Sequence, residues 1–566
     1  MTSLQRYSTG GRTYWRIVES YRDKGRPKLR LVKHLGSADD ILALLASEER
    51  RFEVRSVAHG AVASLLAAAE ELGVVGIIDA AVASFTGQTP QRRNGLSPGQ
   101  SCLLIALGRA CHPTSKRGWH RWARATSLPD LWQLRPEELD SQFFWDQMNE
   151  VPLEVLPQIE ERLAAKAIEL AKVPLDLLMY DTTNVFTVIA STNTRPTLPQ
   201  RGWSKQKRHD LRQVGLALLV SRAGQLPLWH HVYQGNEPDV VRFPAVLTAL
   251  RERIQAVTRE VADITLVCDR GNNASKDNQA LVDGSELHYV AALTPSNHLG
   301  LIEEANRGLE PVEVRQGEVV QSWRARRPIW EAERTVVVYV SERLRAGQIR
   351  GLNQHLSQRL KQLTTLAEAL RKPRARRRTR EQVEQEIERL RQGQFVHRVL
   401  KVGLVEHAPG RWTLDPAVDA AAYDDLVTNY LGRRVLITDR HDWSTAEILR
   451  AYRAQCEVEA CFEHLKDPFH LAARPQYHWT DQKIAVHVWC CVLAYLLVRL
   501  VHLRLTERTG YTGTIHTMLE DLGQIRRATV LHKQPGKKGR PRIAHVLDHP
   551  DDPQFAALVT ALDLRA

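Results

Sequence analysis

The segment from Ala451 to Lys466, AYRAQCEVEACFEHLK, limits what this chain can fold into more than any other stretch. Its apolar side chains recur at the spacing of one helical face: Ala454, Val458, Cys461, Phe462 and Leu465. A helix with such a face has to pack against a core, because burial of that face is what stabilises it. We therefore expect one continuous helix over this segment, lying on a larger apolar layer.

A second stripe on the same helix is polar. Tyr452, Glu459 and Lys466 are seven residues apart, which is two helical turns each time, and Gln455 lies one turn before Glu459. The spacing places a carboxylate between an aromatic hydroxyl and an ammonium group. By itself such a stripe is typical of the solvent-facing side of an amphipathic helix. It becomes a candidate site because two other acids stand out in the sequence.

Length and charge bound the class of protein. The chain has 566 residues, too many for one hydrophobic core, and its formal net charge is +13. An excess of Lys and Arg favours a polyanionic partner such as DNA, although a merely basic surface has the same composition. The seven cysteines include no Cys-x-x-Cys pair, so neither a disulfide framework nor a zinc ribbon is indicated. The apolar run over 488–498 is shorter than a bilayer span, and we expect a cytoplasmic protein without a membrane segment.

The first 165 residues divide into two parts. Residues 1–50 alternate in TYWRIVESYRD and KLRLVKHLG around the basic turn Lys24-Gly25-Arg26-Pro27, which predicts a β-hairpin. Residues 51–165 are helical in pattern and carry the Trp- and Arg-rich KRGWHRWARA. This decoration suits a DNA-binding domain, and a plain helical domain with Trp119 and Trp122 in its core is about equally well supported.

An α/β pattern begins at about residue 170. The run LDLLMYDTTNVFTVI is strand-like, and Asp181 interrupts it at a cost unless the carboxylate is used or partnered. A basic loop with Lys205, Lys207 and Arg208 leads to VGLALLVS and QLPLWHHVYQ, which predict an antiparallel meander with the first strand. The buried strand ITLVC then ends at Asp269, and site residues gather at the ends of such strands.

The pattern is interrupted over 291–435. Strand-like pieces there surround a charged helical pair at about 346–394, whose tip carries the basic run 372–378. The α/β character returns over 436–508 with the strand RRVLITDR, the helix that carries Glu459 and a long apolar helix suited to covering a sheet. Residues 509–566 form a basic tail in which KKGRPR is similar to an AT-hook, although a simple basic loop is the better explanation of a single such hexapeptide.

Asp181, Asp269 and Glu459 together indicate a chemistry. Three carboxylates in one place repel one another unless divalent cations neutralise them, and such hard oxygen ligands suit Mg²⁺ or Mn²⁺. Two of these ions can activate an attacking water or 3′-hydroxyl and stabilise the leaving oxygen of a phosphodiester. Lys466 and the basic loop of residues 205–208 are then candidates for holding phosphates.

Several spaced motifs together resemble the bacterial insertion-sequence transposases of the DDE superfamily, which have an RNase H-like catalytic domain. They are YDTTNVFTV around Asp181, GWSKQKRHD, GN with Asp239 downstream, CDRGNNAS around Asp269, and Tyr452-x2-Gln455-x3-Glu459-x6-Lys466. The last is similar to the family's Tyr-x2-Arg-x3-Glu-x6-Lys signature, with Gln455 in place of the arginine. The resemblance covers about residues 170–505, with weaker echoes in the N-terminal hairpin.

The resemblance implies an α/β fold with several parts. We expect an RNase H-like mixed sheet flanked by helices over 170–290 and 436–508, interrupted by a β-rich insertion domain with a helical pair over 291–435. An N-terminal hairpin and a helical DNA-binding domain would precede it. Asp181, Asp269 and Glu459 would bind two Mg²⁺ or Mn²⁺ ions, and an insertion-domain tryptophan, Trp323 or Trp330, would hold a flipped base or hairpin end.

The implied activity is transposition in a bacterial cytoplasm, by a homodimer that binds the double-stranded ends of its own element, cleaves them and joins 3′-hydroxyls to target DNA. The residues expected to contact DNA are Tyr452, Gln455, Lys466, Lys205, Lys207, Arg208 and Trp323. Two alternatives stay open. A transposase-derived DNA-binding protein would bind without cutting, and a free-standing RNase H-like nuclease would cut without strand transfer.

Overall fold

The structure is a computed structural model with two compact units. It describes residues 2–23, 26–48, 52–90, 94–190, 192–203, 208–238, 247–249, 251–256, 263–268, 276–372, 377–474, 476–532 and 542–566. The first unit comprises Met1–Pro152, Asp467–Ala472 and Leu493–Ala566. The second comprises Leu153–Lys466 and Ala473–Val492, and it contains the candidate acids.

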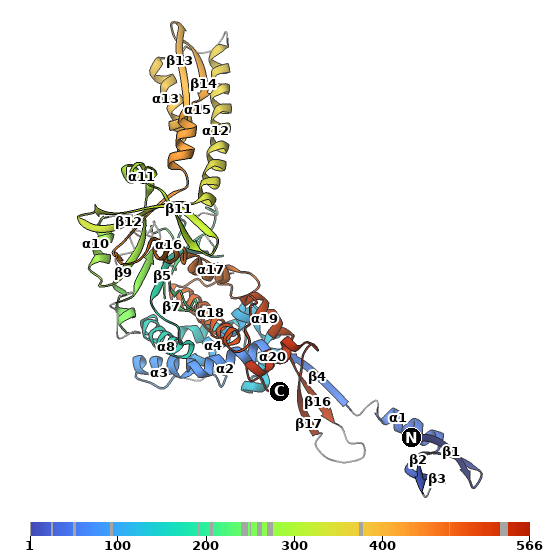
Figure 1. Cartoon of the computed structure of the whole chain (residues 1–566). Helices are drawn as coiled ribbons and strands as arrows, with labels where there is room; N and C mark the ends of the chain where they lie inside the picture. The colour runs from blue at the N-terminus through green and yellow to red at the C-terminus, as the bar shows by residue number, and fades with distance from the viewer. Residues whose placement is uncertain are drawn as a thin grey trace. The chain divides into compact units, whose positions relative to one another are not determined.

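A nine-stranded mixed sheet is the centre of the second unit, in the order β10-β11-β12-β15-β9-β8-β5-β6-β7. Strands β5, β7, β9, β11 and β12 are labelled in Figure 1. The strands are β5 (Leu177–Phe186), β6 (Gln213–Ser221), β7 (Pro227–Gln234), β8 (Thr265–Cys268), β9 (His288–Leu293), β10 (Glu310–Arg315), β11 (Glu318–Ile329), β12 (Ala332–Val340) and β15 (Arg433–Thr438). The predicted meander β5-β6-β7 is antiparallel, whereas β8 is parallel to β5 and β9 is parallel to β8. The mixed sheet expected for an RNase H-like domain is thus confirmed.

The burial of these strands explains their sequences. Every residue of β6 is buried, and its continuous apolar run fits a strand covered on both faces. Helix α8 (Leu156–Ala171) contacts β7, α16 (Thr445–Arg453) contacts β8, β9 and β10, and α17 (Gln455–Lys466) contacts β5 and β6. Two shorter helices, α10 (Lys276–Asp283) and α11 (Leu299–Asn306), flank β9 in the chain. Within β5, burial is relaxed only from Asp181 to Asn184, so the acid lies where the strand is half open.

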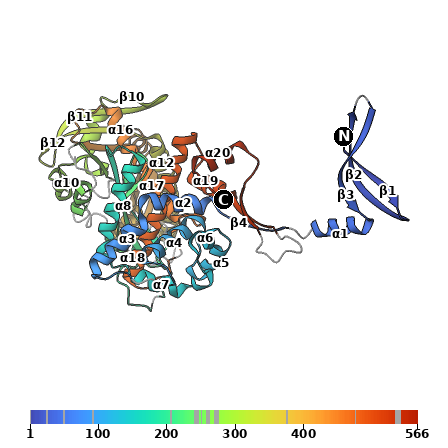
Figure 2. The same cartoon turned by 90° about the horizontal axis from the view of Figure 1, so that it is seen from below.

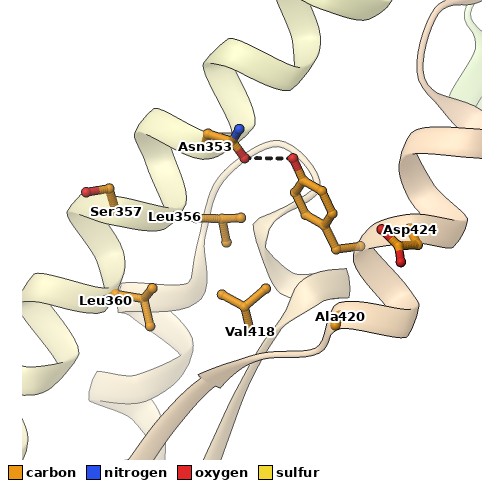
Figure 3. Close-up of a pocket in the computed structure, with 8 residues that line it drawn as sticks. Asn353, Leu356, Ser357, Leu360, Val418, Ala420 and Asp424 are labelled. Carbon is orange, nitrogen blue, oxygen red and sulfur yellow. Dashed lines mark hydrogen bonds between the residues drawn. The ribbon is translucent and has the colours of Figure 1, made fainter.

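The segment 291–435, predicted to be one insertion domain, divides into two parts. Strands β10, β11 and β12 extend the main sheet through β15, a pairing that their sequences did not reveal. The rest forms a module of α12 (Glu342–Arg371), α13 (Arg380–Arg391), α14 (Val396–Val399), the hairpin β13 (Leu400–Ala408) and β14 (Arg411–Val418), α15 (Ala420–Asp425) and a π-helix over Leu426–Tyr430. It has its own apolar core, and the charged helical pair is confirmed. The Tyr423 hydroxyl donates to Asn353 Oδ1 at 2.9 Å beside a cavity of about 440 Å³ between α12, β14 and α15 (Figure 3).

The single helix expected over 451–466 is wrong. A Ser444–Glu447 capping box begins α16, which ends at Arg453, and α17 begins at Gln455. At the junction, the Ala454 amide donates to both Arg450 and Ala451 carbonyls, a bifurcated pattern common where a helix ends. Tyr452 and Glu459 therefore belong to different helices, and the seven-residue stripe is continuous only from Glu459 to Lys466.

The first unit begins with a small sheet of β1 (Thr2–Thr9), β2 (Arg12–Asp23) and β3 (Arg26–Gly36), followed by α1 (Ala38–Glu48) (Figure 2). The predicted β2–β3 hairpin is confirmed, with β1 as a third strand; the expected turn residues Lys24 and Gly25 lie outside the described residues. The helical segment contains α2 (Gly60–Leu72), α3 (Val74–Thr86), α4 (Pro98–Cys111), α5 (Trp119–Arg124), α6 (Leu128–Trp132) and α7 (Ser141–Asn149). Trp119 is in its core and packs on Trp122 and Phe144.

The C-terminal segment is folded, although the sequence suggested a basic tail. It contains α19 (Ile515–Gln524), β16 (Arg526–His532), β17 (Arg542–Asp548) and α20 (Pro553–Ala561). Strand β16 pairs with both β17 and β4 (Phe52–Ala58), and residues 537–541 of the AT-hook-like hexapeptide lie outside the described residues. Helix α18 (Asp481–Thr509) is long and apolar enough to cross a membrane, but 94% of its most apolar window is buried inside the protein.

Candidate active site

Asp181 lies on β5, an inner strand of the main sheet between β8 and β6. Its side chain is half-buried, and its Oδ1 accepts the backbone N–H of Thr182 at 2.7 Å. In the parallel pairing of β5 with β8, Tyr180 lies opposite Cys268, the last residue of β8. Asp269 follows Cys268 in the chain and lies outside the described residues.

Glu459 is presented by α17 and is exposed. The opposite side of this helix is buried through Val458, Cys461, Phe462 and Leu465, as the sequence predicted. Two polar contacts attach the helix to the sheet at its ends. The Gln225 amide, from the turn after β6, donates to the Glu457 carboxylate, and the Lys466 ammonium donates to the Thr183 hydroxyl on β5.

These two contacts show how α17 runs along β5. Gln225 follows the end of β6 at Ser221, which pairs with Leu178 near the start of β5, whereas Lys466 reaches Thr183. The helix therefore runs in the direction of β5. Glu459 precedes Lys466 by seven residues, roughly 10 Å of helix, which equals about three residues of strand. Three residues before Thr183 is Tyr180, so Glu459 lies about level with Tyr180 and Asp181.

Asp181 and Thr183 also share one face of β5, because side chains alternate along a strand. The contact of Lys466 with Thr183 shows that the end of α17 reaches that face. The structure thus associates three of the predicted residues, Asp181, Glu459 and Lys466, with one strand and the helix packed on it.

Tyr452 is buried and contacts an arginine of the main sheet. It lies on α16 with only 4% of its surface exposed. Its hydroxyl accepts a hydrogen bond from Arg434 Nη1 at 2.9 Å, and the Arg434 guanidinium lies 5.8 Å from the ring centre. A ring buried in this way offers no face for stacking on a DNA end. In this structure the Tyr452 hydroxyl holds the Arg434 guanidinium, and a contact between Tyr452 and DNA stays a prediction.

Gln455 stands where the related signature has arginine. It is the first residue of α17 and is half-buried. Its Nε2 atom is fully buried and meets no hydrogen-bond acceptor in the part of the chain that the structure describes. A buried donor without an acceptor costs about 1–3 kcal/mol, so this amide is not explained by local packing.

Of the other predicted DNA contacts, the structure describes Arg208 and Trp323. Lys205 and Lys207 lie outside the described residues. Arg208 is exposed, and its guanidinium donates two hydrogen bonds of 2.8 and 2.9 Å to the Asp210 carboxylate. These bonds lower the pKa of Asp210 to about 2. Trp323 is half-buried on β11, and its ring centre lies 5.7 Å from the Arg327 guanidinium. Trp330 occupies the tight β11–β12 turn with a φ of 50°.

The structure also brings residues to Glu459 that sequence reasoning missed. Glu459 lines a pocket of about 590 Å³ together with Arg434 of β15 and part of α12. The α12 residues include Arg343, Gly347 and Gly351. Two glycines four residues apart inside a helical pattern were the available signal, because glycine is unfavourable in a helix interior.

The residue types at the site fit a hard divalent cation. Asp181 and Glu459 supply carboxylate oxygens, which Mg²⁺ and Mn²⁺ prefer, and Asp181 is half-buried but not sealed from solvent. Among the described residues, no group of three or more His, Cys, Asp or Glu side chains is arranged to hold a metal ion. The third expected ligand, Asp269, is not among these residues.

Two models of protein families match parts of the chain. A model of the IS1634 family transposase N-terminal domain matches residues 2–59, and a model of the transposase DDE domain matches residues 185–497. The second match spans more than half of the chain, begins just after Asp181 and includes both Asp269 and Glu459. None of the curated proteins compared with the chain matches it.

Among solved structures, one similar chain comes from the cryo-EM structure of a piggyBac transposase synaptic complex with hairpin DNA. The two chains are 8% identical and superpose with a TM-score of 0.39 over 81% of this chain and 79% of the other.

Proposed function

The chain belongs to the DDE transposases, and we propose that it binds the ends of its own insertion sequence, cleaves them by metal-dependent hydrolysis and joins the 3′-hydroxyl ends to target DNA. The observation that carries this proposal is the attachment of α17 to β5 through Lys466 and Thr183. It holds Glu459 on a helix that runs beside Asp181, as a shared catalytic centre requires.

In this proposal Asp181, Asp269 and Glu459 hold the divalent cations. The bound ions would supply activation of the attacking oxygen and stabilisation of the leaving oxygen. The chain's own groups position the DNA. Arg434, held by the buried hydroxyl of Tyr452, presents a cation toward the pocket that Glu459 lines and is suited to a phosphate.

Lys466 has a positioning role in the same proposal. Its ammonium group binds the Thr183 hydroxyl, so its charge lies against β5 on the face that also carries Asp181. There it fixes α17 and adds positive potential near the acids. Double-stranded DNA is the substrate, and two copies of the chain would hold the two ends of one element.

The test uses the full chain with a linear DNA that carries the sequences flanking its own gene, in Mg²⁺ and then in Mn²⁺. Wild type should cut at a defined position and form strand-transfer products with a second DNA. Asp181→Asn and Asp269→Asn should bind the DNA with nearly unchanged affinity and not cut it, because each removes metal-binding charge and leaves the basic surface intact.

The outcomes separate the three candidate functions. Binding without cutting by wild type in both metals would support a DNA-binding protein that has lost cleavage. Cutting without strand transfer would support a nuclease. Cutting retained by either aspartate variant would refute the role assigned to that residue.

A further inference from the structure

The pocket beside Glu459 has a wall made of bare helix backbone. Gly347 and Gly351 lie one turn apart on α12 and both line it. A Cβ atom built on either glycine would meet no heavy atom within 4 Å beyond its chain neighbours and the backbone of its own helix. Neighbouring packing therefore does not require glycine, and the helix would be more stable with alanine at both positions.

Because no neighbouring side chain occupies the space beside the two glycines, a ligand can lie directly against the backbone of the helix. The volume of about 590 Å³ falls in the range of ligand-binding pockets. Phe395 contributes an apolar wall, and its backbone is held in the left-handed region with a φ of 66°. That conformation is costly for a large side chain and is typical of functional sites.

The charges at the pocket favour an anion. Arg343 and Arg434 face one acid, Glu459, which the proposed function assigns to metal binding. Arg345, two residues along α12, is bound to Glu342 at 3.2 Å. Within the described residues, Arg343 has neither a hydrogen-bond nor an ion-pair partner, so its guanidinium is available to a ligand.

Another cavity of this unit provides a contrast. It is lined mainly by Leu356, Leu360 and Val418, and its one charged lining residue is Asp424 (Figure 3). Nothing there would attract a phosphate. The pocket beside Glu459 is lined by two helical glycines and two arginines, whereas this apolar cavity has neither a glycine nor an arginine in its lining.

We infer that this pocket seats a DNA strand next to the catalytic carboxylate. The sugar–phosphate backbone passes against α12 at Gly347 and Gly351, where a Cβ would block its approach. Arg343 and Arg434 flank its phosphates. The inference rests on the proposed function for the identity of the ligand, and it assigns to α12 the alignment of the strand with Glu459.

The experiment compares the full chain with Gly347→Ala, Gly351→Ala and the double variant. Gly300→Ala is the matched control, because Gly300 is also a helical glycine of this unit with open space around it. Each protein is cross-linked by light to a ten-nucleotide single strand of thymidine and 4-thiothymidine, and the cross-linked residues are mapped by mass spectrometry. Thermal unfolding is measured in parallel.

Wild type should cross-link to residues 341–355 or to Phe395. The double variant should lose these cross-links by about tenfold or more, since one methyl group at a close contact with a ligand costs about that much. Its Tm should stay unchanged or rise. Affinity for the strand falls as salt rises, and Arg343→Gln should make the plot of log affinity against log salt concentration less steep, by about 0.7 in slope. Gly300→Ala should match wild type in cross-linking.

Equal cross-linking by wild type and the double variant would overturn the inference. A loss accompanied by a lower Tm would also overturn it, because the glycines would then be structural. Cleavage of element-end DNA, assayed in the same preparations, separates this inference from the proposed function. If wild type cross-links on α12 but never cuts, the proposed function fails and the pocket assignment stands. If wild type cuts and the double variant is unaffected, only the pocket assignment fails.

Discussion

Replacing Glu459 with glutamine should separate catalysis from stability. Glu459 is exposed, and its carboxylate has no hydrogen bond or ion pair with any described residue. The substitution keeps the shape of the side chain and removes one negative charge from α17. It leaves the two contacts that hold this helix in place, from Glu457 to Gln225 after β6 and from Lys466 to Thr183 on β5, untouched.

The expected magnitudes are very different for the two properties. A surface substitution of this kind changes the free energy of unfolding by about 0.5 kcal/mol or less, which is roughly 2 °C or less in Tm. Loss of a metal-binding carboxylate removes several kcal/mol of transition-state stabilisation. At about 1.4 kcal/mol for each factor of ten, we expect cleavage to fall by about a thousandfold or more.

The assay follows cleavage of labelled element-end DNA in Mg²⁺, with thermal unfolding as the measure of folding. Glu463→Gln is the control, because Glu463 is exposed on the same helix one turn later and loses the same charge. It should cut at a rate close to that of wild type. Equal losses in the Glu459 and Glu463 variants would show that the helix acts through its general charge, and this would refute a catalytic role for Glu459.

Three further outcomes follow from the same structure. Lys466→Met should lower the free energy of unfolding by about 1 kcal/mol and slow cleavage, because it removes the hydrogen bond to Thr183; unchanged cleavage would remove Lys466 from the site. Gln455→Met should leave the free energy of unfolding unchanged or raise it, because it deletes a buried donor without an acceptor. A denaturant titration that shows a loss above about 2 kcal/mol would mean that the Gln455 side chain makes a hydrogen bond in the folded protein. Burial lowers the pKa of His59, whose ring bonds Ser127 and the Arg565 carbonyl. The unfolded histidine therefore binds a proton more readily, and stability should fall as pH drops below about 6.5. His59→Gln should weaken this pH dependence of Tm, and an identical pH profile would exclude His59 as a contributor.

Local patterns predicted much of the catalytic sheet. The alternation and apolar runs of β5, β6 and β7 indicated an antiparallel meander, and the apolar face of α17 indicated the side that packs on it. These features are readable because burial acts on side chains a few residues apart, so the period of the pattern follows the geometry of the element. The charged pair α12 and α13 was recognised for the same reason.

The helix over 451–466 shows where local patterns mislead. Ala454 has high helix propensity and continues the apolar face, so nothing nearby predicts an interruption. Tyr452, in the helix before the interruption, is buried and binds Arg434, which lies 18 residues earlier in the chain on β15. The same holds for β12, whose sequence fits any β-rich module, whereas its place in the main sheet depends on the pairing with β15.

The sequence by itself determined which elements form, which of their faces are apolar and which acids interrupt them, because those properties depend on neighbours within one or two turns. Only the tertiary structure decided that Glu459 shares a pocket with Arg343, Arg434 and two glycines of α12. Those residues are separated by up to about a hundred positions, and their proximity results from how β15 and α12 are connected to the sheet. No local periodicity encodes a contact of that kind, because the free energy that selects it comes from packing of the whole unit.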